Sequence, residues 1–345
     1  QLLPIPETSE EEIEVLVVVC HHTGDLISRC LKSITRSFAN GIRLKVVVMT
    51  STDRVFDGKI TYRESGGPAH KRNLASNLYG RDSKYLIFLD DDAEVSPYTI
   101  WNMVDEMEKR PQCGMGFIKI LKMDRRDVFD DCGSWLTPTG FLWARAGNDQ
   151  QDRGQFDELE PCLASKSAAC ITRRSSFVQA GGFDSDYFIL GEETDLAWRI
   201  WLQGEEVWYF PFARAWHAFD TQLKPKKDYY TLERIHYLGC KNYISMLVTS
   251  LGALRLCLIL PVHLIGWSVS AVGFLCRFDL QRSGLILKGM AHCVTHAGSL
   301  MRKRRRVQTG RVVSDRFLWP FIARNPGLGY YGSRLRRYLT QKLHG

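Results

Sequence analysis

The sequence predicts an α/β protein with a doubly wound mixed sheet, followed by a helical, membrane-associating C-terminal extension. Three observations support this prediction: valine-rich apolar runs alternate with helical patterns, a long charge-free run lies near the C-terminus, and the net charge changes sign along the chain. With 345 residues, 45% of them hydrophobic, the chain is long enough for one large domain and an extension.

Strands and helices alternate in the first part of the chain. The runs "EVLVVVC" (14–20), "LKVVVMT" (44–50) and "SKYLIFLD" (83–90) are apolar and of strand length. Apolar residues at helical spacing follow the first run, and "AHKRNLASNLYG" precedes the third. This order predicts a buried sheet that binds its ligand at the carboxyl ends of the strands.

Later elements are predicted less completely. A helix is expected over "IWNMVDEMEKR", then a less regular middle over 111–180, then a helix beginning in "GEETDLAWR" and stopped by Gly204. A short strand, "EVWYFP", should precede His217. The expected domains are a lead at 1–13, an α/β domain at 14–220 with halves 14–110 and 111–220, and the extension at 221–345.

The charge of the chain is divided between its two regions. Residues 221–345 hold 21 Lys and Arg against 4 Asp and Glu, a net charge of +17, whereas 1–220 carry −9. A basic region of this kind suits an anionic surface. Because its basic residues lie beside apolar segments and not among stacking aromatics, we expect a membrane surface and no nucleic acid.

The extension contains a run at 256–276 of 21 residues without a formal charge. This length fits a transmembrane helix, although Pro261 and His263 within it equally fit a kinked interfacial helix, and a buried core helix is the third alternative. Five consecutive basic residues follow in "MRKRRRV" at 301–307. Either a solvated charge run or a segment held at the cytoplasmic leaflet explains them.

The cysteines and the start of the sequence predict a cytosolic location for the α/β domain. The ten cysteines include no CxxC pair, which favours reduced, packed thiols over a disulfide framework or a zinc site. The opening stretch "QLLPIPETSEEEIEV" is acidic and polar and contains no export signal.

Three adjacent aspartates, Asp90, Asp91 and Asp92, end the third apolar run. Adjacent carboxylates at a strand end suit a hard divalent cation, which takes oxygen ligands. A solvated acidic turn or a helix cap is the alternative, but capping needs only one aspartate.

Further polar groups follow the same pattern. Glu192, Glu193 and Asp195 begin a helix, where the helix dipole favours them or where one serves as a general base in a cleft. His217 is a candidate third metal ligand or a structural histidine. The segment "GGPAHKRN" (66–73) places glycines before basic residues at a helix start, an arrangement that binds phosphate groups.

Taken in order, these segments resemble family 2 glycosyltransferases of the GT-A fold, the class that builds bacterial surface polysaccharides. The likeness covers about residues 14–220. It is carried by "VVVCHHTGDLISRCLKSI", "GGPAHKRNLA", "FLDDDAEVSP", "AACITRRSSFVQAGGFDSDYF" and "GEETDLAWRIWLQGEEVWYFPFARAWH". "HYLGCKNYISML" and the apolar, basic tail also resemble the membrane-associating C-termini of such enzymes.

The resemblance implies a role for each motif. Asp92 and His217, with Asp91, would bind Mg²⁺ or Mn²⁺ at the diphosphate. Glu193 would deprotonate the acceptor hydroxyl for a single displacement with inversion, and Asp195 would orient the acceptor or the base. The nucleotide-sugar site would comprise His21, His22, Asp53, Lys71, Arg72, Asn73, Asp90 and Asp91. Acceptor-binding residues would be Trp135, Gly182 and Glu192.

Two departures from the family pattern concern the nucleobase. The second strand ends in Val48 and Met49, where the family usually has a base-reading aspartate, and only Asp53 lies nearby. The opening turn is "CHHTGD", which brings His21 and His22 toward the nucleotide. The donor is therefore expected to be a UDP-, dTDP- or GDP-linked sugar, without a choice among them.

The leading hypothesis is thus a metal-dependent inverting glycosyltransferase. It would extend a glycan or a lipid-linked acceptor at the cytoplasmic face of a bacterial plasma membrane, as a peripheral or monotopic protein. Two alternatives remain open: a GT-A-like sugar nucleotidyltransferase, and a non-catalytic membrane-bound protein that binds or assembles glycans. The first usually carries a glycine-rich basic loop after its opening strand, and "CHHTGDLISRC" lacks one.

Overall fold

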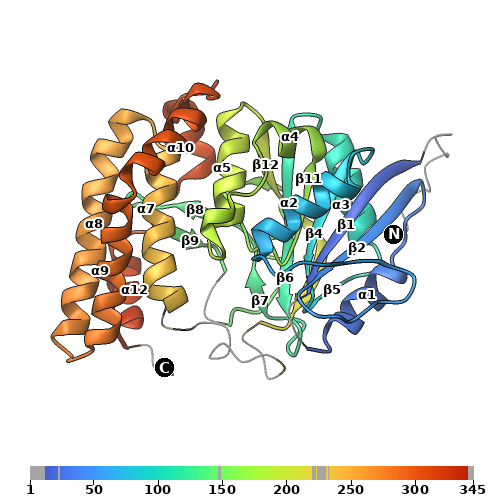
Figure 1. The fold of residues 1–345 in the computed structure, drawn as a ribbon, viewed down its shortest axis with the longest axis horizontal. Helices are drawn as coiled ribbons and strands as arrows, with labels where there is room; N and C mark the ends of the chain where they lie inside the picture. The colour runs from blue at the N-terminus through green and yellow to red at the C-terminus, as the bar shows by residue number, and fades with distance from the viewer. Residues whose placement is uncertain are drawn as a thin grey trace.

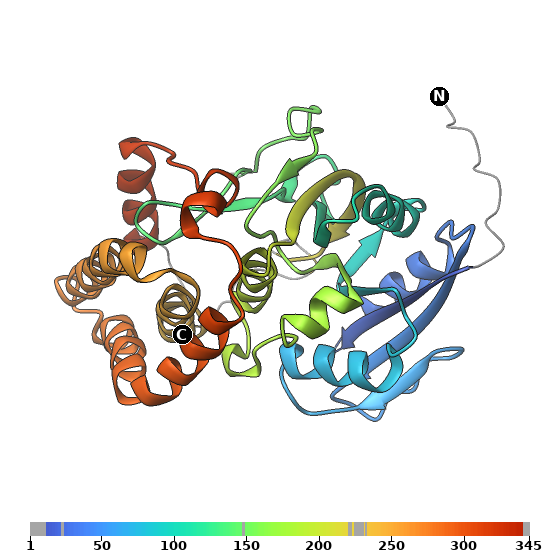
Figure 2. The ribbon, with the colours of Figure 1, turned by 90° about the horizontal axis from the view of Figure 1, so that it is seen from above.

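The computed structural model describes residues 12–21, 24–146, 149–219, 223, 231 and 233–340. A sheet flanked by helices forms one side of the molecule, and a bundle of C-terminal helices forms the other (Figure 1). Figure 2 shows the two parts side by side from above. The predicted combination of an α/β domain and a helical extension is confirmed.

Ten of the described strands form a mixed sheet with the central order β10-β12-β6-β11-β4-β1-β2-β3. On one side β1 (Ile13–His21), β2 (Ile42–Thr50), β3 (Ile60–Arg63) and β4 (Tyr85–Asp90) are parallel. Next to β4, β11 (Ala169–Arg173) runs antiparallel, followed by the parallel pair β6 (Cys113–Lys122) and β12 (Glu206–His217). The shorter strands are β5 (Ala93–Val95), β7 (Phe129–Asp131) and β10 (Glu160–Pro161).

The side chains of β1 explain why helices cover both faces of the sheet. Val15, Val17 and Val19 pack against one layer, and Leu16 and Val18 pack against the other; all five are fully buried. Because successive side chains of a strand point to opposite faces, a continuous apolar run needs two covering layers. Helices α1 (Ile27–Thr35) and α3 (Thr99–Lys109) supply one, and α2 (Pro68–Tyr79) and α5 (Glu192–Leu202) the other.

The prediction of a less regular middle was wrong for its most buried parts. β6 and β11 lie there, in the centre of the sheet, and every residue of β6 is buried. Its sequence, "CGMGFIKILK", contains glycines and lysines, which interrupt the apolar pattern by which a buried strand is predicted. The buried Lys119 is neutralised by Asp152 at 2.7 Å, and Lys122 by Asp149 at 2.7 Å. Pairing is what allows a lysine to remain charged inside a sheet.

The helices predicted over "IWNMVDEMEKR" and from "GEETDLAWR" are present as α3 and α5, and one strand is longer than predicted. Gly204, with a φ of +86°, follows the end of α5 in a conformation that favours glycine. β12 extends through His217, which is therefore the last residue of a strand and does not follow it. The remaining helices of this part are α4 (Arg174–Gln179) and the 3₁₀ helix η1 (Ser185–Tyr187).

The C-terminal part consists of seven helical segments. They are η2 (Glu233–Leu238), α7 (Gly239–Ser250), α8 (Ala253–Leu275), α9 (Leu280–Thr295), α10 (Ala297–Thr309), α11 (Asp315–Ile322) and α12 (Leu328–Thr340), counted within the described residues. Leu318 and Ile322 of α11 belong to the same buried cluster as the sheet. The helices are therefore packed onto the α/β part and do not form a separate tail.

The charge-free run forms α8, which among the described helices is long and apolar enough to cross a membrane. About a third (33%) of its most apolar window is buried. His263 donates from Nδ1 to the carbonyl of Thr139 at 3.0 Å and accepts from Trp267 Nε1 at 2.9 Å. These two hydrogen bonds hold α8 against the turn of the small hairpin formed by β8 (Ser134–Leu136) and β9 (Leu142–Ala144).

The basic run at 301–307 lies in α10 and is only partly exposed. Lys303 pairs with Asp184 at 2.6 Å and with Asp186 at 2.7 Å. Arg304 donates to the carbonyl of Leu251 at 2.7 Å, beside the C-terminus of α7, where cations are favoured. Exposed side chains are left at Arg302, Arg305 and Arg306.

Candidate active site

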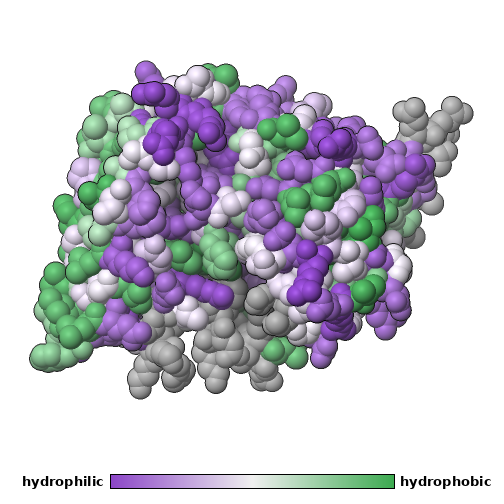
Figure 3. Space-filling view, in the orientation of Figure 1, coloured by the Kyte–Doolittle hydropathy of each residue, from purple (hydrophilic) through white to green (hydrophobic). Residues whose placement is uncertain are grey.

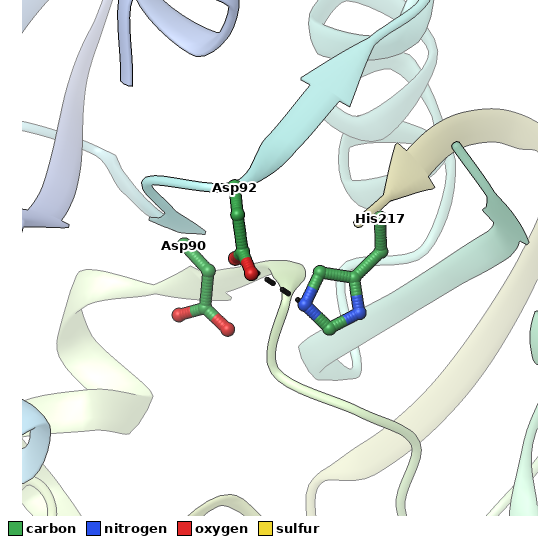
Figure 4. A group of neighbouring side chains, drawn as sticks. All are labelled: Asp90, Asp92 and His217. Atoms are coloured by element: carbon green, nitrogen blue, oxygen red, sulfur yellow. Dashed lines mark ion pairs between the residues drawn. The ribbon is translucent and has the colours of Figure 1, made fainter. Parts of the chain in front are cut away.

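A group of three metal-ligating side chains lies at the carboxyl edge of the sheet. Asp90 is the last residue of β4, Asp92 follows two residues later, and His217 ends β12. β5, which starts at Ala93, pairs with β12 so that Ala93 lies opposite His217. One ligand atom from each of the three side chains lies within 4.8 Å of the others (Figure 4). Two carboxylate oxygens and an imidazole nitrogen form a donor set that fits Mg²⁺ or Mn²⁺.

Carboxylates on both sides control the charge of His217. Its Nε2 lies 3.3 Å from Asp92, and its Nδ1 donates to Asp130 at 2.9 Å. Burial disfavours the imidazolium, but Asp92 and Asp130 outweigh burial and raise the pKa of His217 to about 10. Burial also acts against the Asp130 carboxylate, yet Lys166 and His217 lower the pKa of Asp130 to about 2. Asp130 thus fixes the ring with Nε2 directed at Asp92.

Arg72 is the positive partner of the aspartate cluster. Its side chain is 1% exposed, and it donates to Asp90 at 2.8 Å and to the hydroxyl of Ser167 at 3.2 Å. Glu192 lies 3.5 Å from the same guanidinium. Burial still raises the pKa of Asp90, against the opposing effect of Arg72. Arg72 therefore links the aspartates of β4 to the acidic start of α5.

His21 and Lys71 close the site at the ends of β1 and β2. His21 donates from Nδ1 to Asp91 at 2.8 Å, and the group of three ligating side chains contains Asp90 where the resemblance implied Asp91. Lys71 donates to the carbonyl of His21 at 3.2 Å and to the hydroxyl of Ser51 at 2.5 Å. Burial lowers the pKa of Lys71. The amino group of Lys71 therefore lies near the end of β2, where Val48 and Met49 are buried in the core.

Glu192 and Glu193 begin α5 after Gly191, whose φ of +91° places it in the left-handed region. Burial raises the pKa of both carboxyls, and the neighbouring Glu192 raises that of Glu193 further. The pKa of Glu193 consequently lies well above its ordinary range. A carboxylate with a raised pKa is a stronger base, which suits a group that must accept a proton near neutral pH.

These polar groups line one cavity of about 1150 Å³. The cavity separates the edge of the sheet from the C-terminal helices, and its wall includes residues of both. It contains most of the residues that the sequence placed at the site, namely His21, Lys71, Arg72, Asp90, Asp91, Asp92, Glu192, Glu193 and His217. Residues scattered over about two hundred positions of the chain therefore converge on one space.

The structure places other predicted residues outside this cavity. Asp53 is largely exposed and pairs with Arg63 at 2.5 Å beside a separate, smaller cleft. Trp135 is 1% exposed in the core, with Arg145 5.2 Å from its ring centre. Asp195 is buried and accepts from Arg199 at 2.6 and 2.9 Å. His22 lies outside the described residues.

Asn73 and Gly182 form a structural clasp away from the cavity. The side chain of Asn73 donates to the carbonyl of Phe183 at 2.7 Å and accepts from the amide of Phe183 at 2.8 Å. Gly182 has a φ of +69°, and a Cβ there would lie 2.6 Å from the Asn73 oxygen. The glycine therefore permits the clasp that holds α2 to the segment before α5.

Sequence reasoning missed Asp130, Lys166 and Arg334. Asp130 and Lys166 lie in the segment predicted to be irregular, where no motif marks them. Arg334 lies in α12, more than a hundred residues beyond His217. A cation that lies within an otherwise apolar helix face would have been the only sequence signal for Arg334.

No protein-family model matches the chain, and no curated protein sequence matches it. Solved structures do resemble it. GalNAc-T7, crystallised with UDP, GalNAc and Mn²⁺, has a TM-score of 0.56 and 14% identity over 84% of this chain and 58% of its own. The mannosyltransferase PcManGT from Pyrobaculum calidifontis, in complex with GDP-Man and Mn²⁺, has a TM-score of 0.49 and 15% identity, covering 97% and 87%. S. aureus TarS has a TM-score of 0.49 and 13% identity, covering 86% and 55%.

The likeness to GalNAc-T7 shows that the chain has the GT-A fold that the sequence motifs predict. The chain spans 58% of the length of GalNAc-T7. A shared fold does not fix the chemistry of a site, which must be argued from the side chains at the sheet edge.

Proposed function

We propose that this chain is a metal-dependent glycosyltransferase that moves a sugar from a nucleoside diphosphate to an acceptor hydroxyl with inversion. The observation that carries the proposal is the convergence of the Asp90–Asp92–His217 group and Glu193 on one cavity. GalNAc-T7, which has the same fold, was crystallised with a nucleotide, a sugar and Mn²⁺, and this supports the donor class. Synthesis of bacterial surface polysaccharide is the role that the sequence resemblance implies.

Asp92 and His217, together with Asp90, would hold the Mg²⁺ or Mn²⁺ ion, which supplies charge neutralisation to the departing diphosphate. Arg72 favours the ionised form of Asp90 and holds it in place, and Asp130 keeps the Nε2 of His217 directed at the site. These two buried contacts preorganise the ligands before a donor binds.

Glu193 accepts the proton in the chemical step. The acceptor oxygen forms a bond to the anomeric carbon while the bond from that carbon to the phosphate oxygen breaks. The hydroxyl proton passes to the Glu193 carboxylate, and the bonding electrons leave with the nucleoside diphosphate. The acidic start of α5 and the raised pKa of Glu193 support this assignment.

The nucleotide would lie against the ends of β1 and β2, near His21 and Lys71. Both side chains line the cavity and both are buried, so their hydrogen bonds are held rigidly. In place of the usual carboxylate, this end of the cavity presents the ammonium group of Lys71. The base among UDP-, dTDP- and GDP-linked donors is left to experiment.

We further propose that the enzyme works at the cytoplasmic face of a membrane, as a peripheral or monotopic protein. The exposed apolar residues of α8 and α9 form what we call the outer apolar face, and the turn between the two helices presents Phe278, which is 92% exposed. The face comprises Leu254, Leu258, Val262, Ile265, Val269, Val272, Leu275, Leu280, Leu287 and Val294. Figure 3 shows apolar surface along the edge formed by these helices. Such a face is rare on a protein that stays in water.

A thermal-shift panel tests the donor assignment. The full chain is heated with UDP-, dTDP- and GDP-linked sugars, each with and without Mn²⁺. A donor at 100 times its Kd adds about 2.7 kcal/mol of stability. We expect stabilisation by one nucleotide class that requires Mn²⁺ and that Asp92→Asn removes. Equal melting temperatures across the whole panel would count against the proposed function.

A further inference from the structure

The cavity has a second half, which lies away from the aspartates and from the proposed donor site. Away from the aspartates, its wall is built by the β8–β9 turn and by helices α7, α8 and α12. The side chains there are mostly apolar or aromatic, among them Phe141, Tyr243, Met246, Ile265 and Trp267. A polar glycan placed against this wall would lose hydrogen bonds to water without replacement, which costs free energy.

This apolar half opens onto the outer apolar face. Val262, Ile265 and Val269 line the cavity, yet they are 44%, 63% and 47% exposed. They lie at i, i+3 and i+7 of α8, on one side of the helix. The same side chains therefore belong to the wall of the cavity and to the surface that we propose for the membrane. A hydrocarbon chain could pass from one to the other without crossing polar surface.

Among the described residues, the cation on the α7, α8, α12 and β8–β9 side of this wall is Arg334; Arg234 of η2 lines the cavity as well. Arg334 of α12 donates from Nη1 to the carbonyl of Leu142 at 2.8 Å and to the hydroxyl of Tyr330 at 2.5 Å. These partners are neutral, and among the described residues no carboxylate forms an ion pair with Arg334. A guanidinium held in this way suits a phosphate group, which it can bind through two parallel hydrogen bonds.

Tyr243 lines the same cavity as Arg334 and the proposed base Glu193. The cation and the base therefore face one space. A ligand that touches Arg334 through a phosphate can present a hydroxyl of its head group toward Glu193.

We propose that the acceptor is an amphiphile: a hydroxylated head group joined through phosphate to a hydrocarbon chain. This proposal rests on the proposed function. The chain lies in the apolar half of the cavity and leaves it over Val262, Ile265 and Val269, the phosphate contacts Arg334, and the hydroxyl meets the sugar at Glu193. In the transfer step the hydroxyl oxygen bonds to the anomeric carbon, its proton goes to Glu193, and the nucleoside diphosphate leaves with the bonding electrons.

Binding of a simple amphiphile tests the assignment without knowledge of the head group. n-Dodecyl phosphate, below its micelle concentration, is titrated into the full chain by calorimetry, with n-dodecanol and inorganic phosphate as partial probes. The test variants are Val269→Asp and Arg334→Gln. Their controls are Val178→Asp, on α4 and 55% exposed but outside both the cavity wall and the outer apolar face, and Arg336→Gln, exposed on the same helix as Arg334.

We expect saturable binding of dodecyl phosphate that each test variant weakens about tenfold or more, because one buries a charge and the other removes the phosphate partner. The controls should stay within about twofold. The proposal is overturned if dodecyl phosphate shows no saturable binding, if Val178→Asp weakens its binding as much as Val269→Asp, or if inorganic phosphate binds as tightly.

The same preparations separate this inference from the proposed function. Mn²⁺-dependent binding of the donor found in the thermal panel is measured for each variant. Intact donor binding together with absent amphiphile binding would remove only the acceptor assignment. Loss of donor binding in the wild-type chain would remove the proposed function itself.

Discussion

His217 donates to Asp130 across 2.9 Å, and this contact directs the other ring nitrogen of His217 toward Asp92. Three elements meet here: β12 ends in His217, β7 carries Asp130, and the turn after β4 carries Asp92. A carboxylate behind a metal-ligating histidine fixes the orientation of the ring and makes it a better ligand. The candidate metal site thus has a supporting residue that no sequence motif marks.

Replacement of Asp130 should weaken metal binding directly. We expect Asp130→Asn to reduce Mn²⁺ affinity about 10- to 100-fold, because the ring of His217 loses its oriented partner. Electron paramagnetic resonance of free Mn²⁺ measures the affinity without any turnover. Asp127→Asn, an exposed site on the same segment, is the control. Equal Mn²⁺ affinities for Asp130→Asn and the wild-type chain would show that Asp130 does not support the site.

Arg72 should be required for stability as well as for the site. Arg72→Met leaves Asp90 and Glu192 without their buried cation, and breaking a buried pair in this way costs about 3–5 kcal/mol. Denaturant unfolding of the metal-free protein measures the loss. Arg81→Met, exposed just after α2, should change the free energy of unfolding by no more than about 0.5 kcal/mol. A loss below about 1 kcal/mol for Arg72→Met would contradict the assigned role.

The C-terminal helices should lose stability in mild acid through His236. Burial, and to a smaller extent Arg282, lower the pKa of His236 to about 4 against the opposing effect of Asp279. The folded state therefore binds the proton less well than the unfolded chain, whose histidine pKa is about 6.5. The stabilising contribution is complete above pH 6.5 and is lost as the pH falls from 6.5 through 4, by about 2 kcal/mol at pH 5.

Thermal unfolding from pH 7.5 to 5 measures this effect as the difference between the wild-type chain and His236→Gln. The wild-type chain should lose more stability than the variant, which cannot take up the proton. Parallel curves for the two proteins would mean that His236 stays in contact with water.

Vesicle binding should depend on the outer apolar face. We expect Phe278→Asp combined with Leu258→Asp to abolish sedimentation with vesicles containing anionic lipid, because two charges would enter the acyl region. Replacement of Arg302, Arg305 and Arg306 by Gln should weaken binding and reduce its salt dependence. Val178→Asp, an exposed apolar position on α4, is the control. Unchanged sedimentation of the double variant would place the membrane contact elsewhere or remove it.

Substitutions test this contact better than removal of the extension does. Leu318 and Ile322 of α11 are part of the core shared with the sheet, and Ala323 bridges to Leu136. A chain without 250–345 would expose that core, so loss of membrane binding could not be assigned to the outer apolar face.

The sequence predicts those parts of the site that lie in local patterns. Asp90, Asp91 and Asp92 follow a strand with an unmistakable apolar run, and Glu193 begins a helix with a clear stop at Gly204. Each pattern fixes the end of one element, and the ends of strands in a doubly wound sheet meet at one edge. This is why residues far apart in the chain could be assigned to one site.

What the sequence could not predict depends on contacts between distant segments. The burial of β6 depends on ion pairs that Lys119 and Lys122 form with carboxylates about thirty residues later in the chain, at Asp152 and Asp149. Asp195 fits the pattern of a site residue, but Arg199 one turn later binds it in the core. Trp135 is an aromatic residue of the kind that can stack against a sugar ring, yet it is buried beneath Arg145. For β6 and Trp135 the partner lies far away in the sequence and no local spacing reveals it, whereas Asp195 and Arg199 are four residues apart on one helix, a spacing that could have indicated their pairing.

The central claim is that the Asp92–His217 group and Glu193 together transfer a sugar. Its most direct measurement is the release of nucleoside diphosphate from the donor identified in the thermal panel, with Mn²⁺, by the wild-type chain, Asp92→Asn and Glu193→Gln. We predict that Asp92→Asn loses both donor binding and release, whereas Glu193→Gln binds donor normally but releases diphosphate about 10²-fold or more slowly. Near wild-type release by Glu193→Gln, or release by wild-type protein that does not depend on Mn²⁺, would contradict the account.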